Sequence, residues 1–228
     1  MAGLTKVIVA IPACNEAQFI GEVIAKARNH VDEVIVVDDG SMDNTSEVAR
    51  THGARVIKHQ MNQGVGAATR TAFEAIMKGD ADILVTLDGD GQHNADEIPL
   101  LLAPIINRKA DLVIGSRFIQ SNYQQMPRYR KFGIDFITFL YNFGARTKIT
   151  DSQSGFRAYS RRLIESVNIT DAGFGFSVQV LIQARKKGLD IKEVPISCIY
   201  HSQSSSRNPI AHGLAVAFGV LRYRLLSR

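Results

Sequence analysis

The sequence has little that would place the protein across a membrane, outside the cell or on nucleic acid. None of its 228 residues belongs to a run of the roughly 18 uninterrupted apolar residues that a membrane-spanning helix needs. The two cysteines, Cys14 and Cys198, have neither metal-site spacing nor the number that a disulfide framework requires, and no two histidines are four residues apart. No basic helix carries the interleaved aromatics typical of nucleic-acid modules. We therefore expect a cytoplasmic protein with reduced thiols and no nucleic-acid partner.

Composition indicates a folded globular domain. Hydrophobic residues make up 45% of the chain and charged residues 21%. The net charge of +5 could serve phosphate ligands, nucleic acid or an anionic membrane surface, and by itself it does not choose among them. We expect a single domain over residues 1–228.

Short β-branched runs alternate with helical patterns over the first 120 residues. Most of the runs are almost continuously apolar, as parallel strands covered on both faces are, and we predict strands at 6–11, 33–38, 55–59, 83–88 and 111–116. Helical patterns lie between them at 16–29, 41–50, 66–78 and 95–107. In the first helix Asn15 is the expected N-cap and Gln18 completes a capping box; in the last, Pro99 and Pro104 should shorten or kink the helix. This order predicts an α/β fold with a doubly wound, mostly parallel sheet and helices on both faces.

Polar residues gather where three of these strands end. Asn15 and Glu16 follow the first strand, Asp38 and Asp39 end the second, and the segment 88–92 ends the fourth. Ligands of such sheets bind at the carboxyl ends of the strands, so we expect the three clusters to line one crevice.

The run DGDGQ at 88–92 has the composition of a metal site. Its glycines let the backbone turn so that Asp88 and Asp90 can point into one crevice, and Gln92 adds an amide oxygen. Such an all-oxygen site suits Mg²⁺ or Mn²⁺ with a diphosphate completing the shell. The cation would stabilise the charge that develops on a departing nucleoside diphosphate. The simpler alternative is a polar Asp-Gly turn.

Two nearby segments allow more than one interpretation. Asp38 and Asp39 can accept hydrogen bonds from a base or a ribose, while Ser41 or Asp43 could merely cap the next helix. The segment 62–70 superficially suggests a dinucleotide fingerprint but lacks its third glycine. Its glycines fit close packing at a helix start better, with Arg70 as a cation near phosphate.

Arginines recur in two later segments. Arg117 follows the fifth strand, and Asp151, Ser154 and Arg157 stand within seven residues of one another. Arginine suits bidentate recognition of phosphate, although either arginine could instead form a structural salt bridge.

The second half carries two amphipathic segments. Residues 126–148 begin with basic side chains and continue with many large apolar ones, and 209–228 has a similar character. The first could lie in a membrane interface with its basic end on lipid phosphates, or be an ordinary core or dimer helix.

Seven runs in one order carry a family resemblance. The sequence resembles the dolichyl-phosphate mannose synthase-like members of glycosyltransferase family 2, enzymes of the GT-A fold, through IPACNE (11–16), VIVVDDGSMDNT (34–45), NQGVGAATRTAF (62–73), LDGDGQH (87–93), IGSRF (114–118), DSQSGFRAYS (151–160) and EVPI (193–196).

The resemblance implies a role for each matching position. It implies a nucleotide-sugar-binding half over 1–120 and an acceptor half over 121–228. Donor-binding residues would be Pro12, Asn15, Glu16, Asp38, Asp39, Arg70 and Asp88. Mg²⁺ or Mn²⁺ would be held by Asp88, Asp90 and Gln92. Catalytic residues would be Asp90, Arg117 and Asp151, and the acceptor would meet Arg117, Ser154, Arg157 and Arg207, the last on a loop closing over the site.

The implied reaction is inverting transfer of a hexose, with GDP-mannose as the default donor, to a dolichyl or polyprenyl phosphate. An acceptor phosphate is already ionised near neutral pH and needs no strong general base; Asp151 is the candidate base for a hydroxyl acceptor. UDP-glucose, UDP-N-acetylglucosamine and hydroxyl acceptors remain alternatives, as does a non-catalytic nucleotide-sugar-binding protein. A signalling receiver domain would leave IPACNE and the last hundred residues unexplained. We expect peripheral association with the cytoplasmic membrane face, and a homodimer is possible.

Overall fold

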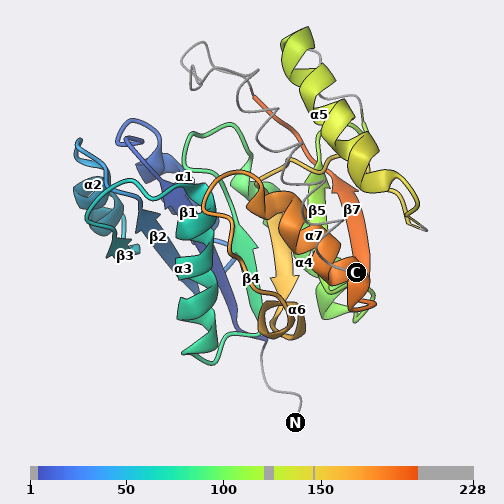
Figure 1. The fold of residues 1–228 in the computed structure, drawn as a ribbon. Coiled ribbons are helices and arrows are strands. Elements are labelled where there is room, and N and C mark those ends of the chain that lie inside the picture. The colour runs from blue at the N-terminus through green and yellow to red at the C-terminus, as the bar shows by residue number, and fades with distance from the viewer. Residues whose placement is uncertain (1–4, 121–125, 146, 200–228) are drawn as a thin grey trace.

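The computed structural model describes residues 5–120, 126–145 and 147–199 (Figure 1). The expected helix at 209–228 and the expected acceptor residue Arg207 lie outside these ranges.

One seven-stranded sheet forms the centre of the described structure, in the order β3-β2-β1-β4-β6-β5-β7. Its strands are β1 (Val7–Ala13), β2 (Glu33–Asp38), β3 (Arg55–Lys58), β4 (Ile83–Thr86), β5 (Leu112–Ser116), β6 (Arg157–Ser160) and β7 (Ile191–Pro195). Strand β6 runs antiparallel to both of its neighbours, β4 and β5, while every other pairing is parallel. The predicted mostly parallel sheet is confirmed, with one reversed strand that the sequence pattern did not predict.

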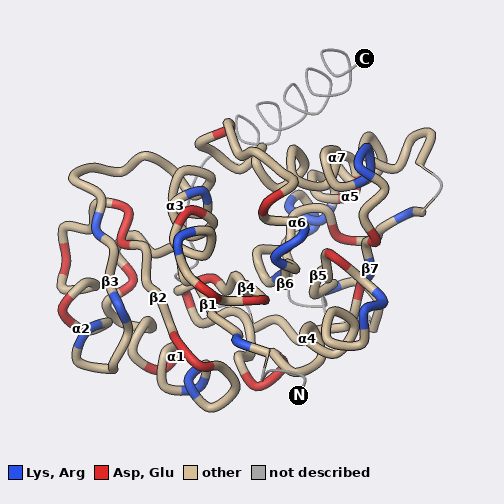
Figure 2. Tube along the Cα trace, turned by 90° about the horizontal axis from the view of Figure 1, so that it is seen from below, with Lys and Arg blue, Asp and Glu red and all other residues tan. Residues whose placement is uncertain are grey.

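Helices cover both faces of the sheet, as predicted (Figure 2). One face carries α1 (Ile20–Ala27), α2 (Thr45–Thr51), the short 3-10 turn η1 (Ala95–Glu97) and α4 (Ile98–Ile106). The other face carries α3 (Val65–Met77), α5 (Arg128–Asn142), α6 (Arg161–Ser166) and α7 (Phe176–Lys186). Among the described residues, no helix combines the length and apolar character needed to cross a membrane.

Alternation along the buried strands builds two cores from one sheet. In β1, Ile8 and Ala10 belong to the cluster beneath α3 and α7, whereas Val7, Val9 and Ile11 belong to the cluster beneath α1 and α4. All five side chains are at most 6% exposed. This period-two division explains why the strand sequences are almost continuously apolar.

Two helix predictions need correction. Helix α1 begins at Ile20 with Phe19 as its N-cap, so the predicted cap at Asn15 and capping box with Gln18 are wrong. Asn15 instead adopts a left-handed backbone, with φ of 59°, and its side-chain oxygen accepts from the Met42 N–H at 2.8 Å. Since Asn tolerates this conformation, the residue serves the loop that joins β1 to α1.

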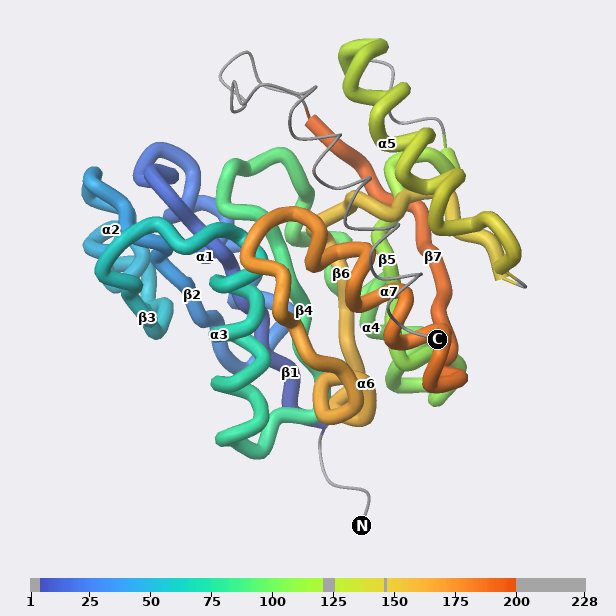
Figure 3. The backbone as a smooth tube through the Cα atoms, viewed as in Figure 1, coloured from blue at the N-terminus to red at the C-terminus, as the bar shows by residue number. Residues whose placement is uncertain are grey.

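The start of α3 confirms the close-packing interpretation of its glycines. The carbonyl of Ala172 accepts from the N–H groups of Gly66 and Ala67, and the segment before α7 lies against this helix start (Figure 3). A Cβ on Gly66 would come within 2.1 Å of the Asp171 carbonyl oxygen. The glycine is therefore required by backbone-to-backbone contact.

We predict that Gly66→Ala lowers the free energy of unfolding by roughly 2–4 kcal/mol, because backbone atoms must move to admit the methyl group. Gly133→Ala is the matched control: it lies in α5 with nothing within 4 Å of the added Cβ. It should raise stability by about 0.5–1 kcal/mol through helix propensity. Urea denaturation measures both, and equal effects would contradict the packing assignment.

Candidate active site

Carboxylates from separate loops meet at the carboxyl end of the sheet. Strand β4 ends at Thr86, so Asp88 and Asp90 lie on the loop beyond it rather than at the strand end. Glu16 follows β1 next to them, and its pKa is raised to about 7, first by burial and then by the charges of Asp90 and Asp88. Burial likewise raises the pKa of Asp88, and burial together with Asp88 raises that of Asp90. The predicted convergence of the first and fourth strand clusters is thus observed.

Glycines allow this crowding. Gly91 has a φ of +72°, which turns the chain after Asp90. A Cβ on Gly155 would lie 2.5 Å from both carboxylate oxygens of Asp88, so the backbone before β6 packs directly on that carboxylate. Thr86 fastens the same loop by donating to the Gly155 carbonyl at 2.7 Å.

The donor atoms here fit a hard divalent cation. Gln92 donates to Asp90 through its backbone N–H at 3.0 Å and its side-chain amide at 2.6 Å, so its amide oxygen is the part not engaged by Asp90. Within the described residues no cluster of three or more His, Cys, Asp or Glu side chains is arranged to hold an ion. Two carboxylates and one amide oxygen therefore suit a cation whose remaining ligands come from a diphosphate.

Sequence reasoning gave no role to His93, the residue after Gln92. Its imidazole is 7% exposed, packs on Phe156 with ring centroids 5.6 Å apart, and places Nε2 3.3 Å from Asp88 Oδ2. Burial lowers the pKa of His93 to about 4, so the ring is neutral near pH 7. Its Nδ1 has no hydrogen-bond partner in the described structure. The signal in the sequence that could have indicated a role for His93 is its position directly after the run DGDGQ.

The acids that end β2 are engaged by the protein itself. Asp38 is fully buried and accepts from Ser41 N–H at 2.8 Å and from the Ser46 hydroxyl. Asp39 accepts from the N–H groups of Gln63 at 2.9 Å and Gly64 at 2.7 Å. Asp39 Oδ1 is also 2.7 Å from His59 Nδ1. These carboxylates hold the loops around the crevice.

Arg117, whose charge lowers the pKa of Asp88 against the effect of burial, belongs to a buried ion pair. Arg117 and Asp151 are 4% and 0% exposed, and join through Nε to Oδ2 at 2.7 Å and Nη2 to Oδ1 at 2.8 Å. The adjacent Arg117 charge offsets burial and holds the pKa of Asp151 below its usual range. Glu193 of β7 fixes the same turn by accepting from the N–H groups of Thr150 at 2.7 Å and Asp151 at 2.9 Å. Asp151 is thus built to hold Arg117, and its low pKa suits a general base poorly.

Two expected acceptor residues lie inside the protein. Arg157 is 1% exposed and donates to the backbone carbonyls of Ser154, Ser177 and Ser152 at 2.9, 3.0 and 2.7 Å. Ser154 is fully buried, and its hydroxyl accepts from Phe156 N–H. Both residues support the loop that contacts Asp88, and neither presents its side chain to the crevice.

Two further arginines bear on the site. Arg70 in α3 is half-buried and forms no ion pair or hydrogen bond with the described residues. Arg130 in α5 lies near enough for its charge to lower the pKa values of Asp88 and Asp90 against the effect of burial. The basic start of the predicted amphipathic segment therefore reaches the crevice. Pro12 lies within β1, partly exposed and paired with Val37 of β2.

We predict that Glu16→Gln stabilises the metal-free protein at alkaline pH. Because the native pKa exceeds the ordinary value of 4.5, the folded state binds more protons than the unfolded chain between about pH 4.5 and 7. The free energy of unfolding attributable to Glu16 therefore falls as pH rises through this window. The variant should exceed the wild type by roughly 1–3 kcal/mol at about pH 8 and by far less at about pH 5.

Urea titrations at both pH values measure this difference. Glu74→Gln, at an exposed carboxylate in α3, is the control and should show little change with pH. Parallel pH profiles for wild type and Glu16→Gln would contradict the prediction.

Comparison with known proteins agrees with this geometry. A family model described as glycosyl transferase family 2 matches residues 8–167. The UDP-N-acetylglucosamine–dolichyl-phosphate N-acetylglucosaminyltransferase of Methanococcus voltae is 36% identical, over 95% of this chain and 93% of its own. The undecaprenyl-phosphate mannosyltransferase of Micrococcus luteus is 31% identical, over 96% of this chain and 99% of its own.

Solved structures of glucosyl-3-phosphoglycerate synthase from Mycobacterium tuberculosis share the fold. Its complex with phosphoglyceric acid superposes with a TM-score of 0.79 at 26% identity, covering 96% of this chain and 80% of that one. Its complex with Mn²⁺, UDP-glucose and phosphoglyceric acid gives a TM-score of 0.75 at 25% identity, covering 96% and 79%. The fold, the acidic crevice and the matched family model agree, and the chain belongs to glycosyltransferase family 2.

Proposed function

We propose that this glycosyltransferase moves a sugar from a nucleoside diphosphate to a polyprenyl phosphate in a reaction that depends on a divalent cation. The observation that carries the proposal is the division of charge around Asp88. The charges of Asp90 and Asp88 raise the pKa of Glu16, while the charges of Arg117 and Arg130 lower that of Asp88 against the effect of burial. Such a site suits two phosphate-bearing substrates: the donor diphosphate would be bound through a cation, and the acceptor phosphate through arginine.

The donor half lies on the acidic side. Asp88, Asp90 and Gln92 would hold Mg²⁺ or Mn²⁺, which would neutralise charge on the diphosphate when bound. Arg70 adds a guanidinium without a described partner, suited to the same diphosphate. Pro12 near the end of β1, with Asn15 and Glu16 after the strand, would line the donor side. Asp38 and Asp39 would act indirectly, by holding the loops against which the nucleotide rests.

The acceptor half lies on the basic side. Arg117, held by Asp151, and Arg130 would attract the acceptor phosphate toward Asp88. An oxygen of that phosphate would attack the anomeric carbon, forming a new C–O bond while the bond to the diphosphate breaks and its electron pair leaves with the diphosphate. No proton has to be removed, which agrees with an Asp151 that is already committed to Arg117. Attack opposite the leaving group would invert the anomeric centre.

The named relatives support the acceptor class and leave the donor open. Two of them act on dolichyl or undecaprenyl phosphate, one with UDP-N-acetylglucosamine in its name and one named a mannosyltransferase. GDP-mannose is our predicted default donor. The UDP-sugars are the alternative, supported by that N-acetylglucosaminyltransferase and by the solved UDP-glucose complex.

Helix α5 supports peripheral membrane contact. Ile134, Ile137 and Tyr141 on its inner face are buried, so part of the segment is an ordinary core helix. Its outer face is a stripe of aromatics exposed by 48–73%, hereafter the aromatic stripe: Tyr129, Phe132, Phe136, Phe139 and Phe143. Spacings of three and four residues place these rings on one side of the helix, as in helices that lie in a membrane interface. A dimer interface is the competing use of this surface.

We predict transfer of label from a GDP- or UDP-sugar to a polyprenyl phosphate, measured as radioactivity in the organic phase. Asp90→Asn should lower the rate at least about 100-fold, because it removes charge where the leaving diphosphate is stabilised. Asp80→Asn is the matched control and should keep full activity, because this carboxylate is 81% exposed and precedes β4, whereas Asp90 follows that strand.

The alternative outcome is equally informative. Donor turnover without organic-phase label would move the acceptor to a hydroxyl compound, as the phosphoglyceric acid in the solved neighbour allows. Equal rates for Asp90→Asn and Asp80→Asn would refute the assignment of the site.

We predict that cation removal weakens binding of the nucleotide itself. With EDTA, the affinity for UDP or GDP measured by calorimetry should fall by at least about tenfold, since the acids would then face the diphosphate unscreened. Mn²⁺ or Mg²⁺ should restore it in the wild type and fail to do so in Asp88→Asn. Unchanged affinity in EDTA would rule out the proposed cation site.

A further inference from the structure

A cavity of about 580 Å³ lies alongside α5, which lines it from Lys131 to Asn142. Its apolar walls include Phe118, Phe139, Phe143 and Ile149. The charged lining residues are Lys148 and the ion pair of Lys131 with Asp135. Rings and aliphatic carbons with a few charged groups suit a mainly hydrophobic ligand. Nothing in the site described above uses this space.

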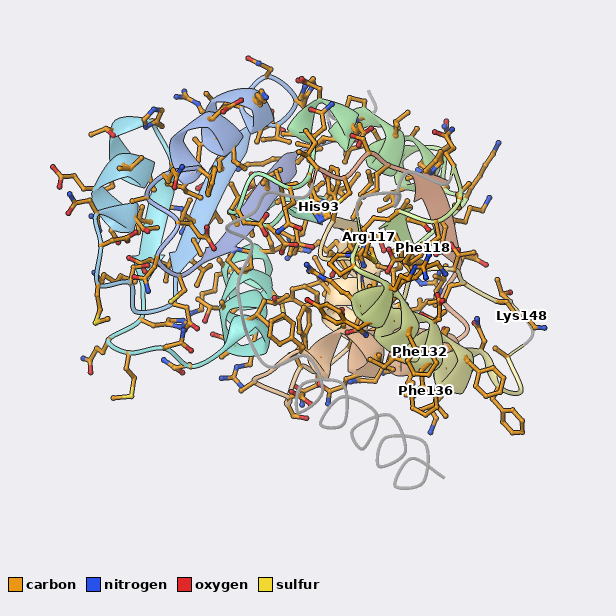
Figure 4. All side chains as sticks on the ribbon, turned by 90° about the horizontal axis from the view of Figure 1, so that it is seen from above. His93, Arg117, Phe118, Phe132, Phe136 and Lys148 are labelled. Carbon is orange, nitrogen blue, oxygen red and sulfur yellow. The ribbon has the colours of Figure 1, made fainter. Side chains whose placement is uncertain are left out.

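The cavity begins where the acceptor side of the active site ends. Phe118 follows Arg117 in the chain, and the Arg117 guanidinium carbon lies 5.8 Å from the centre of the Phe118 ring. On the cavity side, Lys131 Nζ lies 5.4 Å from the same ring and 2.6 Å from Asp135. In Figure 4, His93, Arg117 and Phe118 follow one another from left to right, with Lys148 farthest to the right. A phosphate held at Arg117 would thus have its substituent directed over Phe118.

The outer rim of the cavity coincides with the aromatic stripe. Phe139 and Phe143 line the cavity and are also 62% and 68% exposed on the stripe. Phe132 and Phe136 continue the stripe along α5 without lining the cavity (Figure 4). If the stripe rests in a membrane interface, the cavity opens beside the lipid phase. A long isoprenoid could then pass from the bilayer to the active site without crossing water.

We infer that this cavity binds the first isoprene units of the acceptor, the part of the polyprenyl chain next to its phosphate. The inference rests on the proposed function and specifies its acceptor. The occupant is an isoprenoid chain rather than a protein segment, because the lining residue Phe118 lies beside the arginine that would take the phosphate and the walls include aromatic rings and aliphatic carbons. Each buried methylene of such a chain favours binding.

The first test uses water-soluble acceptors of increasing length: isopentenyl, geranyl and farnesyl phosphate. For the wild type, kcat/KM should rise at least about tenfold from isopentenyl to farnesyl phosphate. Ala145→Trp places a large ring on the cavity lining and should abolish this rise while leaving transfer to isopentenyl phosphate nearly unchanged. Thr147→Trp, at an exposed position outside the lining, is the control and should keep the rise. The same length dependence in Ala145→Trp as in wild type would overturn the inference.

A second test measures binding without catalysis. The chain contains no tryptophan, so Phe143→Trp introduces a single fluorophore at the cavity rim and Phe132→Trp one on the stripe outside it. Farnesyl phosphate without vesicles should shift the emission of Phe143→Trp to the blue and leave that of Phe132→Trp unchanged. Inorganic phosphate should shift neither. Equal shifts in both variants, or none in Phe143→Trp, would count against the cavity as the binding site.

The two tests separate this inference from the proposed function. Blue-shifted emission in Phe143→Trp with no sugar transfer to any prenyl phosphate would leave the cavity assigned and remove the proposed reaction. Transfer to all three acceptors without a length dependence would retain the reaction and remove the cavity. Adding anionic vesicles should shift the emission of both variants, because the stripe itself then enters the interface.

Discussion

The buried ion pair between Arg117 and Asp151 joins the segments on which the acceptor side of the site is built. It fastens the end of β5 to the loop before β6, and Glu193 of β7 holds that loop through two backbone N–H groups. The same loop brings Gly155 against the carboxylate of Asp88. Removal of one member of a buried pair leaves the other uncompensated and typically costs about 3–5 kcal/mol. The position of Arg117, the loop and Asp88 therefore depend on one interaction, and Arg157 reinforces it from below with three bonds to backbone carbonyls.

The ion pair and the loop that it holds allow three acids, Glu16, Asp88 and Asp90, to lie in an unfavourable arrangement. Burial raises the pKa values of Glu16, Asp88 and Asp90, and the charges of Asp90 and Asp88 raise that of Glu16 further, so these carboxylates are poorly accommodated as anions in the metal-free protein. The charges of Arg117 and Arg130 lower the pKa of Asp88 against the effect of burial, and that of Arg130 does the same for Asp90. Such carboxylates lower the stability of the metal-free fold, and binding of a cation with a diphosphate would relieve the unfavourable charge. The site thus trades folding stability for binding.

Much of the fold could be read from the sequence, because the apolar runs have clear boundaries. Strand β2 was predicted over its full length, and β3, β4 and β5 to within two residues at either end. Strand β6 could not be predicted, since its four residues include Arg157, whose burial depends on backbone carbonyls of the preceding loop and of Ser177 in α7. The sequence shows that an arginine stands at position 157 but not which oxygens surround it. The expected contact between Arg157 and the acceptor therefore does not fit its buried position. The sequence likewise did not show that Asp39 accepts from Gln63 and Gly64, because these partners are more than twenty residues away.

The blocked start of α3 has a consequence for turnover. In dinucleotide-binding folds, free N–H groups at a helix start bind the phosphates. Here the carbonyl of Ala172 occupies those of Gly66 and Ala67, so this helix start does not offer them to a diphosphate. In the proposed reaction the spent nucleotide would be retained chiefly by a cation and by side chains that can move. Departure of the cation would then release the product as well, and the enzyme would clear its site without unfolding any part of its backbone.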